Sequence, residues 1–207
     1  DFKNVIRNTN AELLLGPNYA ILRPEFFKAL KTNCSKKIKK VLVTFGGGDD
    51  RGGNKFVVSS LLDNTPNNIR FVIISGLKNP NNRKLKNWIN SHGKGRIDLS
   101  INPKEIAKLF LTCDIAIISG GTTTYEVDCC GIPFVIISIA DNQIEQSLAW
   151  DKVGKASYLG DINNIDKNLL VSSFNQLLKK KVFLEEKKTT TYDGLYKVSD
   201  LIISKKN

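Results

Sequence analysis

The sequence predicts an α/β protein with a doubly wound parallel sheet of strand order 3-2-1-4-5-6. Short apolar runs alternate with segments of helical periodicity along the 207-residue chain. Strands that alternate with helices form a parallel sheet covered on both faces, and the doubly wound order is the simplest arrangement. In this order the first and the fourth predicted strands lie side by side, and these are the two strands that glycine-rich turns follow, which indicates where a ligand would bind.

Each predicted strand is a short run rich in β-branched or aromatic residues. The predicted strands cover residues 41–45, 69–75, 96–100, 115–118, 134–138 and 156–159. Helices are predicted around residues 56–61, 85–89 and 103–110, over 122–130, around 148–153, and near 166–180 and 192–204. Pro103 favours a helix start, and Gly131-Ile-Pro133 ends the helix that begins near residue 122.

Charge and hydropathy exclude several classes of protein. The net charge is +11, but the lysines are scattered at element ends without interleaved aromatic residues, so no nucleic-acid partner is expected. No apolar run approaches the roughly 18 residues of a membrane span, and the first residues lack the pattern of a signal peptide. A cytoplasmic protein is therefore expected.

The cysteines and the single histidine give no sign of metal or redox chemistry. The four cysteines have no C-x-x-C spacing, which favours reduced thiols in the core. His92 lies in a polar stretch that ends a predicted helix, where a solvated side chain is expected. We therefore expect no metal site and no cofactor.

The fourth predicted strand leads directly into the turn that we expect to bind a ligand. Residues 115–118 are followed by Ser119-Gly120-Gly121-Thr122-Thr123 at a predicted helix start, and helix starts bind anions such as phosphate. The first strand leads into Gly46-Gly47-Gly48. In the doubly wound order these turns face one another across the ligand crevice.

The pattern of these turns argues against two common nucleotide sites. The run G-G-G-D-D-R after the first strand lacks the third glycine of G-x-G-x-x-G, and no acidic residue ends the second strand to hold a ribose. No G-K-S/T follows either turn, which excludes a P-loop. A nucleotide with its diphosphate on residues 120–123 remains, and Glu126, one turn further on, could take the ribose hydroxyls.

A plainer interpretation exists for each of these residues. The glycines are also what tight turns in any doubly wound fold require. Glu126 could equally face solvent on its helix. Asp141, Asn142 and Gln143 follow the fifth strand and are candidates for the sugar side of a nucleotide sugar, but Asp and Asn are also common helix caps.

Six motifs are distributed over nearly the whole chain. They are Tyr19-Ala-Ile-Leu-Arg-Pro-Glu-Phe26, Val43-Thr-Phe-Gly-Gly-Gly-Asp49, Asp114-Ile-Ala-Ile-Ile-Ser-Gly-Gly-Thr-Thr-Thr-Tyr-Glu126, Gly131-Ile-Pro-Phe134, Ile139-Ala-Asp-Asn-Gln143 and Tyr192-Asp-Gly-Leu-Tyr-Lys-Val198. These motifs resemble the C-terminal domain of the UDP-sugar hydrolases of pseudaminic acid biosynthesis and of the related spore coat polysaccharide biosynthesis proteins. More distantly, the chain is similar to the two-domain GT-B glycosyltransferases.

The resemblance implies a Rossmann-like domain that holds UDP or a UDP-sugar. Glu126 would bind the ribose hydroxyls, residues 120–123 the diphosphate, and the backbone of Ile101 the uracil. Asn142 and Gln143 would lie toward the sugar. The run Thr122-Thr-Thr-Tyr125 departs from the family pattern but keeps small and hydroxylated groups for the phosphates.

The resemblance also implies that the catalytic half is absent. The chain opens on Asp1 and contains no methionine, so we expect a fragment. Residues 1–30, punctuated by Gly16-Pro17 and Arg23-Pro24, are predicted to be the crossing segment from a missing N-terminal domain, and residues 31–207 the UDP-binding domain. Catalytic residues, including a histidine that this chain lacks at the required place, are expected in the missing domain.

Three functions stay open on this basis. The first is the nucleotide-binding half of a hydrolase that cleaves UDP from an amino-deoxy sugar in nonulosonic (pseudaminic-type) acid or surface polysaccharide biosynthesis. The second is the donor-binding domain of a GT-B glycosyltransferase. The third is a nucleotide-sugar-binding module without catalysis.

Overall fold

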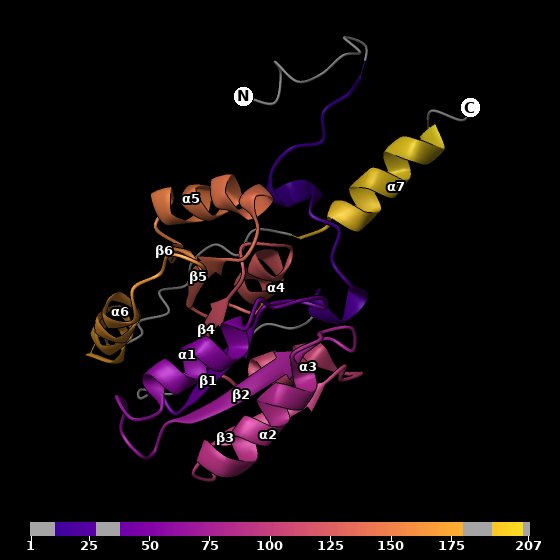
Figure 1. Cartoon of the computed structure of the whole chain (residues 1–207). Helices are drawn as coiled ribbons and strands as arrows, with labels where there is room; N and C mark the ends of the chain where they lie inside the picture. The colour runs from indigo at the N-terminus through magenta and orange to yellow at the C-terminus, as the bar shows by residue number, and fades with distance from the viewer. Residues whose placement is uncertain (1–10, 28–37, 180–191, 205–207) are drawn as a thin grey trace.

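The computed structural model describes residues 11–27, 38–179 and 192–204, and it shows one parallel sheet between two layers of helices (Figure 1). All neighbouring strands of this sheet run parallel. The strand order within the described residues is β3-β2-β1-β4-β5-β6, so the predicted order is confirmed. The strands are β1 (Lys40–Thr44), β2 (Arg70–Ser75), β3 (Ile97–Ile101), β4 (Ile115–Ile118), β5 (Phe134–Ser138) and β6 (Ala156–Asp161).

The helices fall between the strands as the periodicity predicts. They are η2 (Pro17–Tyr19), η3 (Pro24–Phe26), α1 (Gly53–Leu61), α2 (Asn82–His92), α3 (Ile106–Leu111), α4 (Thr123–Cys129), η4 (Asp141–Gln143), α5 (Ile144–Lys152), α6 (Lys167–Lys179) and α7 (Gly194–Ser204). The helix predicted from Pro103 begins three residues later, at Ile106, because Asn102 adopts a left-handed conformation (φ 50°) and Glu105 is not helical.

Alternating strand residues form two cores, one on each face of the sheet. Val41 and Val43 of β1 pack with α1, α2 and α6, and Leu42 packs on the opposite face with α3, α4 and α5. Every residue of β4 and β5 is buried, as expected for central strands of a parallel sheet. These two strands therefore hold the turns that follow them in fixed positions.

The N-terminal segment and α7 lie together on the side of the sheet that α4 and α5 cover (Figure 1). Leu22 and Phe26 are buried in the core of that face, and the Phe26 ring lies 5.5 Å from the ring of Phe110 on α3. Tyr192 enters the same core just before α7 begins. The described part of the predicted crossing segment is thus packed on the sheet domain, and the crossing itself stays a prediction.

Candidate functional site

The two glycine-rich turns meet at the carboxyl edge of the sheet. β1 and β4 are neighbours, with Thr44 opposite Ile118. The N–H of Ser119 donates to the carbonyl of Thr44 at 3.2 Å, which joins the end of one strand to the turn of the other. In a doubly wound sheet this is the place where connections leave in opposite directions and where ligands bind.

The first turn leaves open space above its glycines. Gly46 has a left-handed conformation (φ 89°), and no atom lies within 4 Å of the positions that β-carbons at Gly46, Gly47 or Gly48 would occupy. Beneath the turn, Gly76 after β2 packs directly on the backbone, because a β-carbon there would lie 2.0 Å from the carbonyl oxygen of Gly47. The need for glycine at position 76 could not be predicted from the sequence, because Gly47 belongs to the turn after another strand.

The helix that follows the first turn already has an anion at its start. The buried carboxylate of Asp50 accepts hydrogen bonds from the N–H of Gly52 (2.9 Å), from the N–H of Asn54 (3.3 Å) and from the side-chain amides of Asn54 and Asn81 (2.8 Å each). A carboxylate of the protein itself therefore occupies the start of α1.

The start of α4 is different, because no side chain caps it. Within the described part of the chain, the N–H groups of Gly121, Thr122 and Thr123 donate to no carbonyl or side chain. The N–H of Gly120 does have an acceptor, the side-chain carbonyl oxygen of Gln143, at 3.3 Å. Of the two helix starts, the one at α4 is thus the one that no carboxylate of the protein occupies, and its backbone donors are left for an anion.

The start of α5 braces this turn. The side-chain oxygen Oε1 of Gln143 accepts hydrogen bonds from the N–H groups of Gly120 (3.3 Å) and Ile139 (3.0 Å), and the side-chain amide of Gln146 donates to the carbonyl of Gly121 (3.0 Å). Gly120 packs so tightly here that a β-carbon would lie 2.2 Å from the Oγ of Ser147. Gln143 is therefore a support of the turn, and only its amino group is left to face a ligand.

The other two sugar-side candidates are exposed. Asp141 and Asn142 form the solvent-facing part of η4, directly before α5. No side chain caps η4 or α5, so the alternative role of these residues as helix caps is not what the structure shows. Ile101, the candidate for the uracil, ends β3 at the same carboxyl edge and is 39% exposed, and two strands, β2 and β1, lie between β3 and β4.

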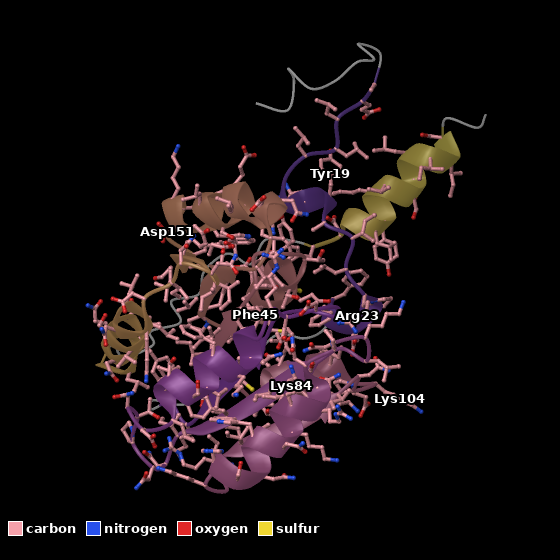
Figure 2. The ribbon with its side chains drawn as sticks, viewed as in Figure 1. Tyr19, Arg23, Phe45, Lys84, Lys104 and Asp151 are labelled. Carbon is pink, nitrogen blue, oxygen red and sulfur yellow. The ribbon has the colours of Figure 1, made fainter. Side chains whose placement is uncertain are left out.

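Glu126 lies on α4 and is mostly buried, with 13% of its side chain exposed, rather than facing solvent. Its Oε1 accepts a hydrogen bond from the guanidinium of Arg23 at 2.9 Å. Arg23 is labelled in Figure 2 and belongs to the N-terminal segment. Arg23 belongs to the motif of residues 19–26, whose sequence pattern indicates no role for its side chain. Its partner is 103 residues away in the chain, so only the fold brings the two together.

The remaining candidates for chemistry lie elsewhere. His92 is the last residue of α2 and stacks on Trp88 with ring centroids 5.4 Å apart. Cys113 and Cys130 are buried, Cys129 is half-buried, and Cys34 lies outside the described residues. Among the described residues no group of three or more His, Cys, Asp or Glu side chains could hold a metal ion, and no helix is long and apolar enough to cross a membrane.

Comparison with solved structures identifies the class of domain. MurG from Acinetobacter baumannii superposes with a TM-score of 0.62 at 15% identity over 86% of this chain and 55% of that one. UDP-GlcNAc 2-epimerase from Neisseria meningitidis, bound to UDP-GlcNAc, superposes with a TM-score of 0.59 at 20% identity, over 81% of this chain and 45% of that one. The fold is therefore the Rossmann-like domain of the GT-B type.

Sequence comparison adds the nearer relationship. The chain is 29% identical over 156 residues to the spore coat polysaccharide biosynthesis protein SpsG of Bacillus subtilis, which covers 73% of this chain and 44% of SpsG. It is 30% identical over 139 residues to the UDP-2,4-diacetamido-2,4,6-trideoxy-beta-L-altropyranose hydrolase of Campylobacter jejuni, covering 67% and 48%. No protein-family model matches.

These relationships confirm the resemblance noted from the motifs. The chain is related in sequence to SpsG and to the UDP-sugar hydrolase of the pseudaminic acid pathway, and it has the GT-B type of fold. It spans less than half the length of either of these two relatives.

Proposed function

We propose that this chain is the nucleotide-binding half of a UDP-sugar hydrolase that releases UDP from an amino-deoxy sugar in nonulosonic acid or surface polysaccharide biosynthesis. The observation that carries the proposal is the contrast between the two helix starts at the carboxyl edge. The Asp50 carboxylate occupies the start of α1, whereas the start of α4 has N–H groups with no acceptor among the described residues and Glu126 one turn further on. The relationship to a hydrolase of a UDP-linked diacetamido-trideoxy sugar supports this substrate class.

The proposed arrangement assigns one part of the ligand to each part of the edge. The diphosphate lies on the amides of Gly121, Thr122 and Thr123, in the turn formed by Ser119 and Gly120. The ribose hydroxyls donate to Glu126, and the uracil lies by the backbone of Ile101. The open space above residues 46–48 leaves room for the ligand, and Asp141, Asn142 and the amino group of Gln143 lie toward the sugar.

In this proposal the chain contributes positioning and charge stabilisation rather than the attacking water. As the bond between the sugar and the diphosphate breaks, negative charge grows on the departing UDP. Backbone donors already in place stabilise that charge without reorganisation, and tight binding of the nucleotide orients the sugar for attack. The group that activates water is proposed to come from a second domain that is not part of this sequence.

Titration calorimetry of the 207-residue chain with UDP tests the proposal. We expect UDP to bind, and Glu126→Gln to weaken binding roughly tenfold or more because hydrogen bonds to a charged group contribute about 1.5–3 kcal/mol. Glu145→Gln on the exposed face of α5 is the matched control and should leave the affinity unchanged. Absence of UDP binding would contradict the proposal as a whole.

A second candidate is the donor-binding half of a glycosyltransferase, which the similarity in fold to GT-B proteins favours. It would hold UDP in the same way but pass the sugar to an acceptor. The full-length protein, incubated with a UDP-sugar and no acceptor, should release free sugar rapidly if hydrolysis is the native reaction. Binding without either cleavage or transfer would favour a non-catalytic nucleotide-sugar module.

A further inference from the structure

We infer that Arg23 is a positioning residue for Glu126, and that the N-terminal segment thereby sets the preference of the site for ribonucleotides over 2′-deoxyribonucleotides. The inference rests on the proposed function, since it concerns the carboxylate assigned there to the ribose. It adds a residue from outside the sheet to a site otherwise built from strand ends.

The backbone at Arg23 is fixed by burial on both sides. Leu22 is 3% exposed and Phe26 fully buried, both in the core beneath α3, α4 and α5. Pro24 restricts the backbone of Arg23 to the extended conformation observed (φ −66°, ψ 142°) and begins η3. The carbonyl of Phe26 also accepts a hydrogen bond from the thiol of Cys129 on α4, at 3.0 Å. The segment is thus attached to the helix that carries Glu126.

The guanidinium group of Arg23 is held from three directions. It lies 5.1 Å above the centre of the Phe26 ring, its NH1 contacts Oε1 of Glu25 at 3.2 Å, and its NH2 donates to Oε1 of Glu126 at 2.9 Å. The second oxygen of Glu25 accepts the N–H of Ala107 in the first turn of α3, at 3.3 Å. A planar group with this many contacts has little freedom left to lose when a ligand binds.

This arrangement uses only part of the Glu126 carboxylate. Arg23 occupies Oε1, and within the described ranges no donor contacts Oε2. A carboxylate has about four acceptor sites, so a ribose diol can donate to Oε2 and to the second lone pair of Oε1. Arg23 therefore fixes the orientation of the carboxylate and still leaves acceptors for the 2′- and 3′-hydroxyls.

The local charge argues that Arg23 acts through Glu126 rather than directly on the diphosphate. Its one positive charge faces two carboxylates, those of Glu25 and Glu126, so the group of three carries a net negative charge. A net negative group gives an anionic diphosphate little electrostatic attraction, whereas its carboxylates can accept hydrogen bonds from the neutral hydroxyls of a ribose. The expected consequence of losing Arg23 is therefore a loss of ribose recognition.

Calorimetry with UDP and dUDP on the 207-residue chain separates these possibilities. We expect the wild-type chain to bind UDP roughly tenfold more tightly than dUDP. Arg23→Gln should reduce this ratio of affinities to about twofold or less, mainly because UDP binds more weakly. Glu126→Gln should give the same low ratio, and the double variant should add nothing further. Arg23→Lys should recover part of the ratio, because an ammonium group can still reach Oε1.

Arg70→Gln is the matched control. Arg70 has the same side-chain exposure as Arg23 (45%) and pairs with Asp98 at 3.1 Å, but it begins β2 at the opposite edge of the sheet. Its substitution should leave both affinities unchanged. If Arg23→Gln folds poorly, Arg23→Met keeps the aliphatic stem over Phe26 without the donors and serves the same measurement.

Two results would overturn the inference while leaving the proposed function intact. If Arg23→Gln weakened the binding of UDP and of dUDP equally, Arg23 would act on the diphosphate. If the variant left both affinities unchanged, the ion pair between Arg23 and Glu126 would have no role in binding. If the wild-type chain binds neither nucleotide, the proposed function fails and this inference fails with it.

Discussion

At the scale of single residues, Gly120 and Gly121 are adjacent in the sequence but differ in the space that their neighbours leave for a side chain. A β-carbon at Gly120 would lie 2.2 Å from Oγ of Ser147 and 3.0 Å from the backbone carbonyl oxygen of Gln143. At Gly121 the nearest atom is 3.8 Å away, an ordinary contact. The first glycine is needed for packing on α5, and the second is not.

Gly120→Ala should therefore lower the free energy of unfolding by about 1–3 kcal/mol, the usual cost of overpacking. Gly121→Ala should change it by less than about 0.5 kcal/mol. Urea unfolding of both variants beside the wild type measures the difference. If the two variants were equally destabilised, Ser147 on α5 would be able to move away from an added β-carbon, and the close packing would not require glycine at position 120.

The glycines of the site could be found from the sequence, but their separate roles could not. A pair of glycines after an apolar run indicates a turn at a strand end whatever the neighbours are. Whether each glycine is needed for conformation, for packing or for open space depends on residues such as Ser147 and Gly47, which the fold brings close. Arg23 was missed for the same reason, since its partner is on α4.

At the scale of elements, the strands were the most predictable part of the chain. β4 and β5 are continuous apolar runs because both faces of a central parallel strand are buried, and that pattern is local. The residues that support the site are harder to predict from the sequence. Gln143 and Gln146 brace the β4 turn through side-chain amides at the start of α5, a role that composition and periodicity do not reveal.

The end of α4 gives a prediction about pH. Burial raises the pKa of the Cys129 thiol to about 11 and that of Cys130 to about 12. An unfolded cysteine has a pKa of about 8.5, so the unfolded chain loses these protons first as the pH rises. The contribution of the neutral thiols to stability is complete below about pH 8.5 and declines as the pH rises toward 11 and 12.

Urea unfolding between pH 7 and pH 10 measures this decline. We expect Cys130→Ala to be less stable than the wild type at pH 7 because a buried side chain is truncated, but to lose less stability as the pH is raised. Lysine and tyrosine titrations occur equally in both proteins and cancel in the comparison. Parallel pH profiles for the two proteins would contradict the assignment.

At the scale of the whole molecule, the two ends of the described chain converge on α4. Arg23 and the carbonyl of Phe26 contact Glu126 and Cys129, and the hydroxyl of Tyr192 donates to Asp128. Three neighbouring positions of one short helix thus bind segments from opposite ends of the chain. The helix proposed to hold the nucleotide is also the helix that attaches the N-terminal segment and α7.

The junction between those two segments depends on Gly194, the first residue of α7. A β-carbon there would lie 2.4 Å from the carbonyl carbon of Tyr19 and 2.5 Å from the carbonyl oxygen of Ala20. Both are backbone atoms, so the segments have to separate if Gly194 is replaced. The ring contact between Phe27 and Tyr196, at 5.6 Å, would be strained by the same movement.

We expect Gly194→Ala to lower the free energy of unfolding by about 1–3 kcal/mol and to increase amide hydrogen exchange in residues 11–27 and 192–204 more than in the sheet. Gly48→Ala, with no neighbour within 4 Å, is the control and should leave exchange in both segments unchanged. Because Ala20 precedes Arg23 by only three residues, loosening this junction should also reduce the ratio of UDP to dUDP affinity. A uniform rise in exchange across the sheet would show instead that α7 stabilises the whole domain, and that the terminal segments do not respond as a separate unit.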